Sequence, residues 1–539
     1  MTNERLPPTE ISRRDALRTL GGVAGTATLA GCTSVLGGTD SGTTMRYAQV
    51  LAPLELDPIV VDDPWSAGAA SMVFEGLYTY DYDLNLVPVL AASKPAVGDD
   101  GKTYTVELVE GATFQDGSRV TAEDVRYSFE PATYEAVRSP NVWQVSMIEG
   151  IATPDERTVE FTLKYPYPAF ERVLTRGVVP KSVRRGSPET FGTEDPVGSG
   201  PYRPEIFKPG KYVVFSAWED YWGPVQPAIE TVKVVPNHAG LARSMSLRTN
   251  QNDIVERVHP KLWRVTEGMP NTRVVSTDSY HSHFVAFNCS DEPTSRPKVR
   301  EAVDYLFSMD EFAKHVVGRA GRRQYSPLPR QLARAWDMPL EEWRAIPHRK
   351  NHEKARVLLE EAGVGSWSPN VAVPATKSSG DKMREKLAET IVHGLRELGF
   401  RKARVKTYPW RTFREKVLSG NADDYAMYVG SWPGYPDPDT FLYPLFHRDM
   451  EGLTNGTYYS NERVMRRIDA ARKTDDRRER ARSYEDAITT LLEDRVHLPA
   501  YTLANSFGVK DRVKGFEPHP LSQFNPRFVG PNGSVSLRE

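Results

Sequence analysis

The hydrophobic pattern of this chain changes in type near Lys298, and that change limits the folds that the chain can adopt. Before Lys298, apolar and polar residues alternate in short runs bounded by turns, which is typical of half-buried strands. After it, apolar residues recur at helical spacing. The expected strands lie at 104–109, 159–163, 212–215, 231–235 and 283–287. The expected helices lie at 298–307, 353–362, 382–398, 410–418 and 461–493, the last with a break near Thr474. Strands and helices in one chain predict an α/β fold of several lobes.

The length and the charge balance exclude some classes of protein. A chain of 539 residues is too long for a single hydrophobic core, so we expect two or three lobes. Lys and Arg number 69 and Asp and Glu number 71, which leaves a formal net charge of -2. Binders of nucleic acid or of membrane surfaces need a basic face, and nothing in this balance predicts one. No stretch reaches about 18 uninterrupted apolar residues, so no transmembrane helix is expected.

The first residues have the features of an export signal. Arg13 and Arg14, within residues 12–18, resemble a twin-arginine export motif, and an uncharged stretch follows as far as Gly31. At about 1.5 Å per residue, that stretch is too short to cross a ~30 Å hydrocarbon core as a helix. It ends in Leu-Ala-Gly before Cys32, which resembles a lipobox, the motif in which the cysteine thiol takes a lipid.

We therefore expect residues 1–31 to be a twin-arginine lipoprotein signal and residues 32–44 to be a flexible tether of mostly small and polar residues. The rest of the chain would be held at the extracytoplasmic face of the cell membrane through the lipid on Cys32. The alternative is a short buried helix in which the cysteine occurs by chance.

No catalytic or metal-binding constellation emerges from the spacing of the polar residues. The chain has no Gly-rich phosphate loop, no GxSxG elbow and no dinucleotide fingerprint, so we expect neither an enzyme nor a cofactor. The only two cysteines are Cys32 and Cys289, and a disulfide between them is disfavoured because Cys32 lies in the lipobox. His281 and His283 would share one face of a strand, where an ordinary structural pair is more common than a metal site.

Several short motifs, read in order, resemble the family 5 extracellular solute-binding proteins. That family comprises the dipeptide, oligopeptide and nickel receptors of ABC importers. The most specific motif is residues 114–118, Phe-Gln-Asp-Gly-Ser, which continues to Thr-Ala-Glu-Asp-Val at 121–125. The other matching segments are 74–77, 86–91, 99–104, 196–202, 220–223, 287–290, 299–303 and 435–442. Each segment is weak alone, but the ordered set extends from about residue 45 to about residue 505.

The resemblance implies an α/β, three-lobed, periplasmic-binding-protein-like flytrap of type II, in its large cluster C form. Lobe I would comprise residues 45–81, 195–285 and 505–539. Lobe II would be an insertion at 82–194, and lobe III would span 286–504. A monomer of this kind would close over a short peptide or other small polar solute and deliver it to the permease and ATPase subunits of an importer.

The resemblance also implies residues for the ligand site. Asp62 matches a position where the family contacts the ligand backbone. Trp432 and Tyr435 would supply a stacking wall, and Asn288 and Cys289 would line the crossover between lobes. Gly434 stands where oligopeptide receptors have an aspartate that pairs with the peptide's α-amino group.

Three alternatives stay open at this point. The absence of that aspartate leaves a sugar, an opine or a metal chelate as the ligand in place of a peptide. A ligand sensor or scavenger without a permease would have the same fold. An exported hydrolase or redox enzyme is the third, disfavoured possibility. For Asp437 and Asp439 we expect a structural role, with the carboxylates capping turns in a Pro-rich loop.

Overall fold

The computed structural model describes residues 43–375 and 382–538, and the residues from 43 onward form one compact unit. The predicted signal with Arg13 and Arg14, the predicted lipidation site Cys32 and nearly all of the tether lie outside the described residues. Within the two described ranges, no helix combines the length and the apolar character that crossing a bilayer requires.

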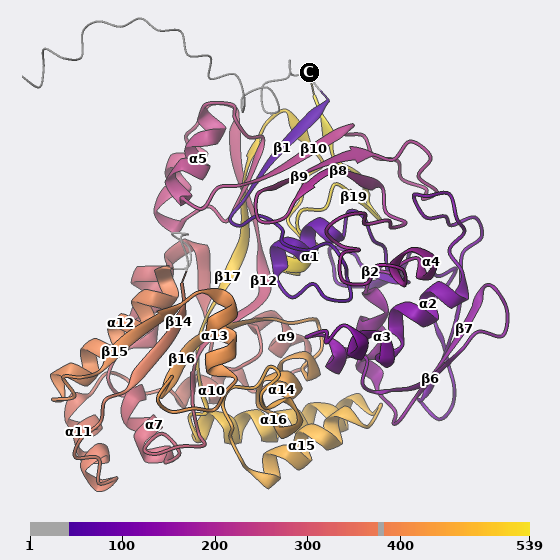
Figure 1. The fold of residues 1–539 in the computed structure, drawn as a ribbon. Coiled ribbons are helices and arrows are strands. Elements are labelled where there is room, and N and C mark those ends of the chain that lie inside the picture. Colours follow the sequence, from indigo (N-terminus) through magenta and orange to yellow (C-terminus); the bar gives the residue numbers. More distant parts are fainter. Residues whose placement is uncertain (1–42, 376–381, 539) are drawn as a thin grey trace, which may run out of the picture. The chain divides into compact units, whose positions relative to one another are not determined.

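An eleven-stranded mixed sheet is the largest element, and two long strands, β12 (Thr272–Phe287) and β17 (His497–Lys510), form its centre. Figure 1 shows β12 and β17 extending from the region of β1, β9 and β10 to the region of β14 and β16. Outward from β12, the strands are β16 (Met427–Pro433), β14 (Asn370–Pro374) and β15 (Arg404–Tyr408). Outward from β17, they are β11 (Ile254–Glu256), β1 (Thr44–Gln49), β10 (Thr231–Pro236), β9 (Tyr212–Ala217) and β8 (Tyr202–Lys208). The short strand β13 (Gly321–Arg323) also pairs with β17.

The two long strands take part in different hydrophobic cores along their length. On β17, Phe507 and Val509 pack in one core, whereas Leu498 and Tyr501 pack in another. The β12–β17 pair therefore takes part in two hydrophobic cores. The β12–β17 pairing is interrupted by register shifts, one of them between Asp278 and Ser282, so the ladder is locally irregular where it passes from one core to the other.

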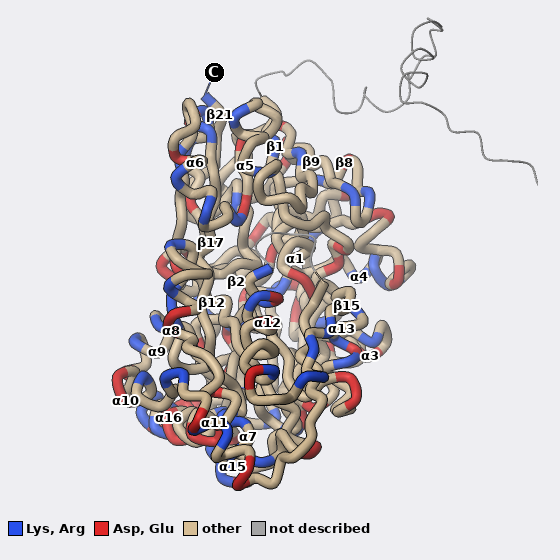
Figure 2. The backbone as a smooth tube through the Cα atoms, turned by 90° about the vertical axis from the view of Figure 1, so that its left-hand side faces the viewer, with Lys and Arg blue, Asp and Glu red and all other residues tan. Residues whose placement is uncertain are grey.

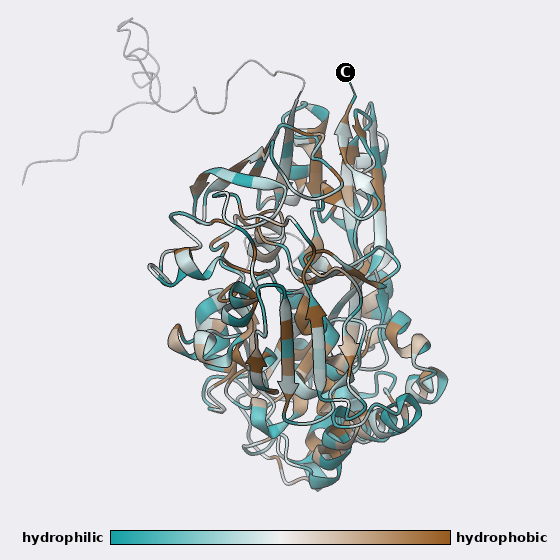
Figure 3. Ribbon diagram, turned by 90° about the vertical axis from the view of Figure 1, so that its right-hand side faces the viewer, coloured by the Kyte–Doolittle hydropathy of each residue, from teal (hydrophilic) through white to brown (hydrophobic). Residues whose placement is uncertain are grey.

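A separate antiparallel sheet lies within residues 96–163. Its strands, in order, are β4 (Ala96–Val97), β5 (Thr103–Glu107), β7 (Thr158–Leu163) and β6 (Ile148–Ala152). Burial alternates along β7, so its apolar residues face a core that also takes in Phe129 of helix α2 (Ala122–Phe129). Strands in Figure 3 likewise carry brown and teal bands in turn, which is the hydropathy pattern of strands with one buried face.

The predicted helices after Lys298 are confirmed, and most bounds agree to within a residue. The break near Thr474 is present, because Lys473–Asp476 separates α15 from α16. The helices of this region are α7 (Pro297–Asp304), α8 (Met309–Phe312), α9 (Arg330–Ala335), α10 (Leu340–Ala345), α11 (His352–Glu361), α12 (Lys382–Glu397), α13 (Trp410–Val417), α14 (Asp439–Phe446), α15 (Glu462–Arg472) and α16 (Arg477–Glu493). The helices before it, besides α2, are α1 (Pro64–Ala70), α3 (Pro131–Ala136), α4 (Lys181–Arg184), α5 (Gly240–Arg248) and α6 (Trp263–Glu267).

The predicted strands are also confirmed, with bounds that differ by up to two residues except in one case. The run at 283–287 is only the end of β12, which begins eleven residues earlier at Thr272. Its first half is rich in Ser, Thr and Asp, so propensity alone does not reveal it, and pairing with β17 supplies the missing stabilisation. The lobe boundaries expected from the resemblance stay a prediction, since the residues from 43 onward group into one unit.

Charged residues of both signs are interspersed along the chain. In the view of Figure 2, basic and acidic segments occur next to each other on the same elements, as the near-zero net charge leads one to expect. This distribution is that of a solvated surface with many local ion pairs.

Candidate ligand-binding cleft

A cavity of about 340 Å³ is lined by segments that are far apart in the sequence. That volume lies in the usual range for sites that take small molecules. The lining residues come from the stretch between Pro58 and Phe74 around α1, from residues 140–144 and 175–177, from Phe284 of β12, from α13, from β16 with Tyr435 and Thr440, from Leu445, Leu453 and Thr454, and from Gln523 and Phe524. The site exists only when the chain is folded, because no single segment makes more than one part of its wall.

Aromatic side chains form much of the wall, and the geometry of a strand pair explains why they gather there. Tyr428, Gly430 and Trp432 alternate on β16 and so share one face of the strand. Phe284 of β12 lies directly opposite Gly430. A Cβ atom on Gly430 would lie 2.7 Å from the Phe284 ring, so the glycine makes room for that ring. The ring centroids of Phe284 and Tyr428 are 6.2 Å apart, in an edge-to-face arrangement.

Two further aromatic pairs extend this wall. Trp143, from the segment before β6, lies with its ring centroid 6.4 Å from that of Trp432. On α13, Trp410 and Phe413 stack with their centroids 5.9 Å apart, and Trp410 stays 42% exposed at the rim. Residues three apart in a helix share a face, so both rings point to the same side. Flat apolar faces therefore meet in the cleft from three different parts of the chain.

The cleft is crossed by one ion pair. The Arg414 guanidinium of α13 donates to the Asp62 carboxylate, which lies just before α1. Both side chains are partly exposed, so water screens the pair and its contribution to stability is about 0–1 kcal/mol. The contact nevertheless joins residues that are 352 positions apart, and it connects the two sides of the cavity wall.

The other charged side chains of the wall are engaged within the protein. Asp63 accepts hydrogen bonds from the backbone N–H groups of Trp65 and Ser66 and so caps α1. The Arg176 guanidinium donates to the Tyr134 hydroxyl at 3.1 Å, to the Gln144 side-chain oxygen at 3.0 Å and to the Pro58 carbonyl. Burial raises the pKa of Asp63, while its hydrogen bonds to Ser66 oppose that shift.

The structure brings three of the residues singled out from the sequence to this cleft. Asp62, Trp432 and Tyr435 line it. Gly434 is adjacent, and its N–H donates to the Tyr280 carbonyl at 3.1 Å. A Cβ atom at 434 would lie 2.2 Å from the Phe441 ring, so this position has no room for a side chain as the ring is placed.

Asn288 and Cys289 lie away from the described lining of the cleft, just beyond the end of β12. The Asn288 amide donates to the Gly420 carbonyl at 3.0 Å and its side-chain oxygen accepts from Ser290. Cys289 is a free cysteine that packs between two hydrophobic cores, and burial raises the pKa of its thiol to about 11. Both residues therefore make contacts within the protein and do not line the cavity.

Sequence reasoning missed Trp143, Trp410, Phe413, Arg414 and Tyr428 as wall residues. A signal for some of them was present, because 410, 413, 414 and 417 share a helical face and 428, 430 and 432 share a strand face. Nothing local marks Trp143, since its neighbour Trp432 is 289 positions away.

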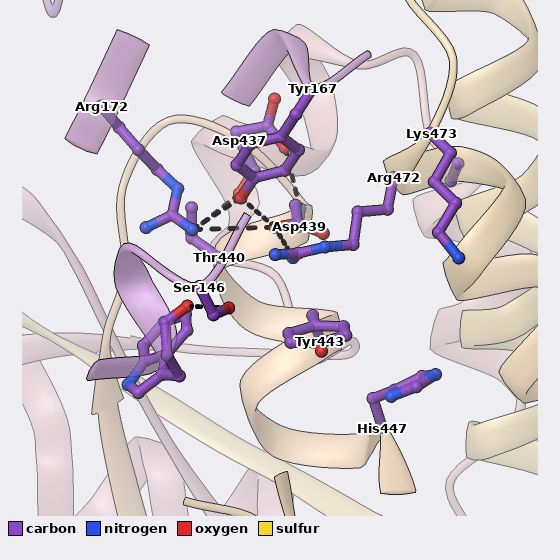
Figure 4. Close-up of polar contacts among 12 residues, drawn as sticks. Ser146, Tyr167, Arg172, Asp437, Asp439, Thr440, Tyr443, His447, Arg472 and Lys473 are labelled. Atoms are coloured by element: carbon purple, nitrogen blue, oxygen red, sulfur yellow. Dashed lines mark hydrogen bonds and ion pairs between the residues drawn. The ribbon is translucent and has the colours of Figure 1, made fainter. Parts of the chain in front are cut away.

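Figure 4 shows a buried ionic cluster that consists of Tyr167, Arg172, Asp439 and Arg472. Tyr167 donates to the Asp439 carboxylate at 2.5 Å, Arg472 donates to the same oxygen at 2.6 Å, and the nearest Arg172 nitrogen is 3.7 Å away. The three charged side chains are at most 3% exposed. The Arg172 guanidinium carbon lies 5.6 Å from the centre of the Trp143 ring, so the cluster adjoins the cleft.

The cluster connects two parts of the chain, because Tyr167 and Arg172 lie near 170 whereas Asp439 begins α14 and Arg472 ends α15. Burial alone would raise the pKa of Asp439, but the charges of Arg472 and Arg172 outweigh it and hold that pKa below its ordinary value.

The turn-capping role predicted for Asp437 is confirmed, since its carboxylate accepts from the Asp439 N–H at 2.9 Å. The same prediction for Asp439 is wrong, because its carboxylate binds side chains from other elements.

The described residues contain no group of three or more His, Cys, Asp or Glu side chains placed to hold a metal ion. His281 and His283 do share a strand face, with their rings stacked 4.9 Å apart. Burial lowers the pKa of His281 to about 3, with the charges of Arg257 and Arg384 adding to the effect. Both rings are therefore neutral in the folded chain at ordinary pH.

Comparison with known proteins agrees with this architecture. Protein XP55 of Streptomyces lividans is 29% identical over 519 residues, which cover 92% of this chain and 91% of the relative. The glutathione-binding protein GsiB of Escherichia coli strain K12 is 26% identical over 454 residues, 82% of this chain and 86% of the relative.

Solved structures share the fold. The oligopeptide-binding protein AppA of Bacillus subtilis, in complex with a nonapeptide, superposes with a TM-score of 0.79 at 21% identity, covering 92% of this chain and 99% of that chain. The periplasmic binding protein AgaA of A. tumefacien R10, in complex with agropinic acid, gives 0.80 at 24%, with coverage of 92% and 99%.

The family model for bacterial extracellular solute-binding proteins, family 5, matches residues 85–451. That span is more than half of the chain and includes most of the cleft wall. The chain belongs to the family 5 bacterial extracellular solute-binding proteins.

Proposed function

We propose that this chain is the substrate-binding receptor of an ABC importer, which captures a small solute by closing its cleft and presents it to the permease and ATPase subunits. The observation that carries this proposal is the cavity of about 340 Å³ whose wall combines residues around α1 with residues of α13 and β16. A ligand that contacts both sides favours the closed form in proportion to its differential affinity for the two forms.

The two long strands support hinge closure as the mechanism. Hinges in binding proteins are a few residues between packed bodies that absorb changes in backbone angle. β12 and β17 are shared by two hydrophobic cores, and their ladder is irregular between Asp278 and Ser282. The Asp62–Arg414 contact crosses the cleft and would form or break as the two sides move.

The ligand is a peptide or another small polar solute. Similar proteins support that range, since AppA is bound to a nonapeptide, AgaA to agropinic acid, and NikZ of Campylobacter jejuni to Ni(L-His). Within this proposal the chain makes and breaks no bond, and its relatives are likewise named as binding proteins. A ligand sensor without a permease is the second reading of the same cleft.

Mass spectrometry of small molecules released from the purified, denatured protein tests the receptor function most directly. We expect a solute that, when added back, changes tryptophan emission and the scattering curve, because Trp143, Trp410 and Trp432 line the cleft. Chemical turnover of an added solute, or an emission and scattering curve that no metabolite alters, would contradict the proposal.

The same proposal places the chain at the extracytoplasmic face of the membrane, anchored through a lipid on Cys32. The sequence motif at 29–32 supports it. Cys32→Ala is expected to release the protein from membranes into the soluble fraction. Cys289→Ala, which changes the only other cysteine, should leave membrane retention as it is. Unchanged retention of the Cys32 variant would contradict the anchor.

A further inference from the structure

We propose that the ligand of this cleft is a zwitterion, with Asp62 binding its cationic end and Arg414 binding its anionic end. This inference rests on the proposed receptor function, and it names the chemical class of the solute and two residues that select it. It starts from the ion pair that crosses the cavity wall.

The charged side chains of the wall differ in how far they are engaged within the protein. The described lining contains four of them: Asp62, Asp63, Arg176 and Arg414. Asp63 accepts from two backbone N–H groups of α1, and Arg176 donates to three acceptors in the wall. Asp62 and Arg414 instead contact each other, and neither side chain makes another hydrogen bond or ion pair within the described part of the chain.

Both partners of this pair keep unused hydrogen-bonding capacity. A guanidinium group has five N–H donors and a carboxylate has two acceptor oxygens, and the contact engages one nitrogen of Arg414 and one oxygen of Asp62. The side chains of Arg414 and Asp62 are 29% and 40% exposed, and both line the cavity. A solute in the cleft can therefore reach either group.

The two charges lie on elements that can separate. Arg414 belongs to α13, whereas Asp62 lies just before α1, so opening of the cleft would part them. An anion that bound Arg414 would leave Asp62 without a counter-charge as the cleft closed, and a cation at Asp62 would do the same to Arg414. A zwitterion pairs with both groups, and it replaces one exposed contact by two charge-assisted hydrogen bonds. Because these bonds reach both sides, they favour the closed form.

The rest of the wall suits the uncharged part of such a solute. Trp410 precedes Arg414 by one helical turn, so its ring lies on the same side of α13 as the guanidinium. The lining also includes Tyr428, Ser431 and Tyr435, whose hydroxyls are donors as well as acceptors. We expect an apolar side chain of the solute to pack on the rings and a polar group between its charged ends to bind among these hydroxyls.

The first test compares three probes on the full chain by isothermal titration calorimetry. They are the zwitterionic dipeptide alanyl-phenylalanine, its N-acetyl derivative, which is an anion, and its C-terminal amide, which is a cation. We expect the dipeptide to bind at least about tenfold more tightly than either capped form. Equal affinity for a capped form, or no binding of the dipeptide, would overturn the inference.

Two variants then assign the two ends of the probe. With Arg414→Gln, affinity for the dipeptide should fall about tenfold, while the amide, which has no carboxylate to lose, should bind at least as tightly as it does to the wild type. With Asp62→Asn, affinity for the dipeptide should fall similarly and affinity for the N-acetyl derivative should not fall. The exposed pair contributes little to stability, so both variants should fold. A variant that weakens all three probes equally would overturn the assignment.

Arg467→Gln and Asp486→Asn are the matched controls. This pair joins α15 to α16 at 2.8 Å, its side chains are 46% and 40% exposed, and it lies outside the described lining of the cleft. Both controls should bind the three probes as the wild type does, and a loss equal to that of the Asp62 and Arg414 variants would overturn the inference.

Failure of this inference is distinguishable from failure of the receptor function. If the dipeptide fails but a solute released from the purified protein changes tryptophan emission when added back, the zwitterion inference is overturned and the receptor remains. If no solute is released and no metabolite changes the emission, both proposals are overturned.

Discussion

Replacing Asp439 by asparagine should reveal how strongly the buried ionic cluster holds the two parts of the chain together. The substitution keeps the size of the side chain and one oxygen for the Tyr167 hydroxyl, but it removes the charge that Arg472 and Arg172 face. Asp439 is 0% exposed and both arginines are at most 3% exposed. Two buried guanidinium groups would then lack a counter-charge.

The size of the effect follows from that burial. Removing one partner of a buried ion pair costs about 3–5 kcal/mol, because the remaining charge stays in a medium of low polarity. Asp278→Asn is the matched control, since the Asp278 carboxylate accepts from Arg322 at 3.0 and 3.1 Å but is 51% exposed. That exposed pair should contribute only about 0–1 kcal/mol. Asp439→Asn should therefore lower the free energy of unfolding by several times the effect of the control.

Urea unfolding followed by circular dichroism and tryptophan emission measures the difference, and emission is sensitive to the cluster because Arg172 lies 5.6 Å from the Trp143 ring. A chain of several lobes can unfold in more than one step, so the two signals should be compared. A loss no greater than that of the Asp278 variant would refute the reasoning.

The pH dependence gives a second check on Asp439. Its pKa in the folded state is depressed, so its contribution is fully present above the unfolded-state value of about 3.9 and is lost as pH falls through the folded-state pKa. The difference between wild type and Asp439→Asn should be constant near neutral pH and close only in acid.

Three further outcomes are expected. Burial raises the pKa of Glu75 to about 7, so the contribution of this side chain to stability falls as pH rises from about 4.5 to about 7. Glu75→Gln should therefore make the urea midpoint depend less on pH in this range. An unchanged slope of midpoint against pH would contradict the prediction. Gly434→Asp should lower the free energy of unfolding by about 1–3 kcal/mol, because the new Cβ atom would meet the Phe441 ring. Gly434→Ala, which adds only that Cβ atom, should account for most of the loss in the same urea assay. An Asp variant as stable as the wild type would contradict the prediction. In a Cys32→Ala background, the Cys289 thiol, with its pKa raised to about 11 by burial, should react with iodoacetamide slowly at neutral pH and quickly in denaturant; equal rates would count against it.

Local patterns predicted the elements well for a physical reason. Helices such as α12 and the α15–α16 pair depend on contacts three and four residues apart, and their apolar spacing is therefore visible in the sequence. The first half of β12 was not visible, because its polar residues are held in the sheet by β17, which follows more than 200 positions later.

The candidate site was predicted only in part. Asp62, Trp432 and Tyr435 were reached through short motifs and do line the cleft. Asn288 and Cys289 came from the same kind of inference, yet they lie in packed surroundings past the end of β12. A motif identifies a segment, but the direction of each side chain depends on which neighbouring strand covers it.

By itself, the sequence determined the α/β class, the helix and strand order of most of the body, and the resemblance that the family match bears out. These properties depend on residues that are neighbours along the chain. Only the tertiary structure decided that Trp143 meets Trp432, that Arg414 meets Asp62 and that Asp439 is shared by arginines from two regions. Each of these contacts joins positions whose distance in space is set by the order of strands in the large sheet and by the packing of separate cores, and a one-dimensional pattern does not contain that information.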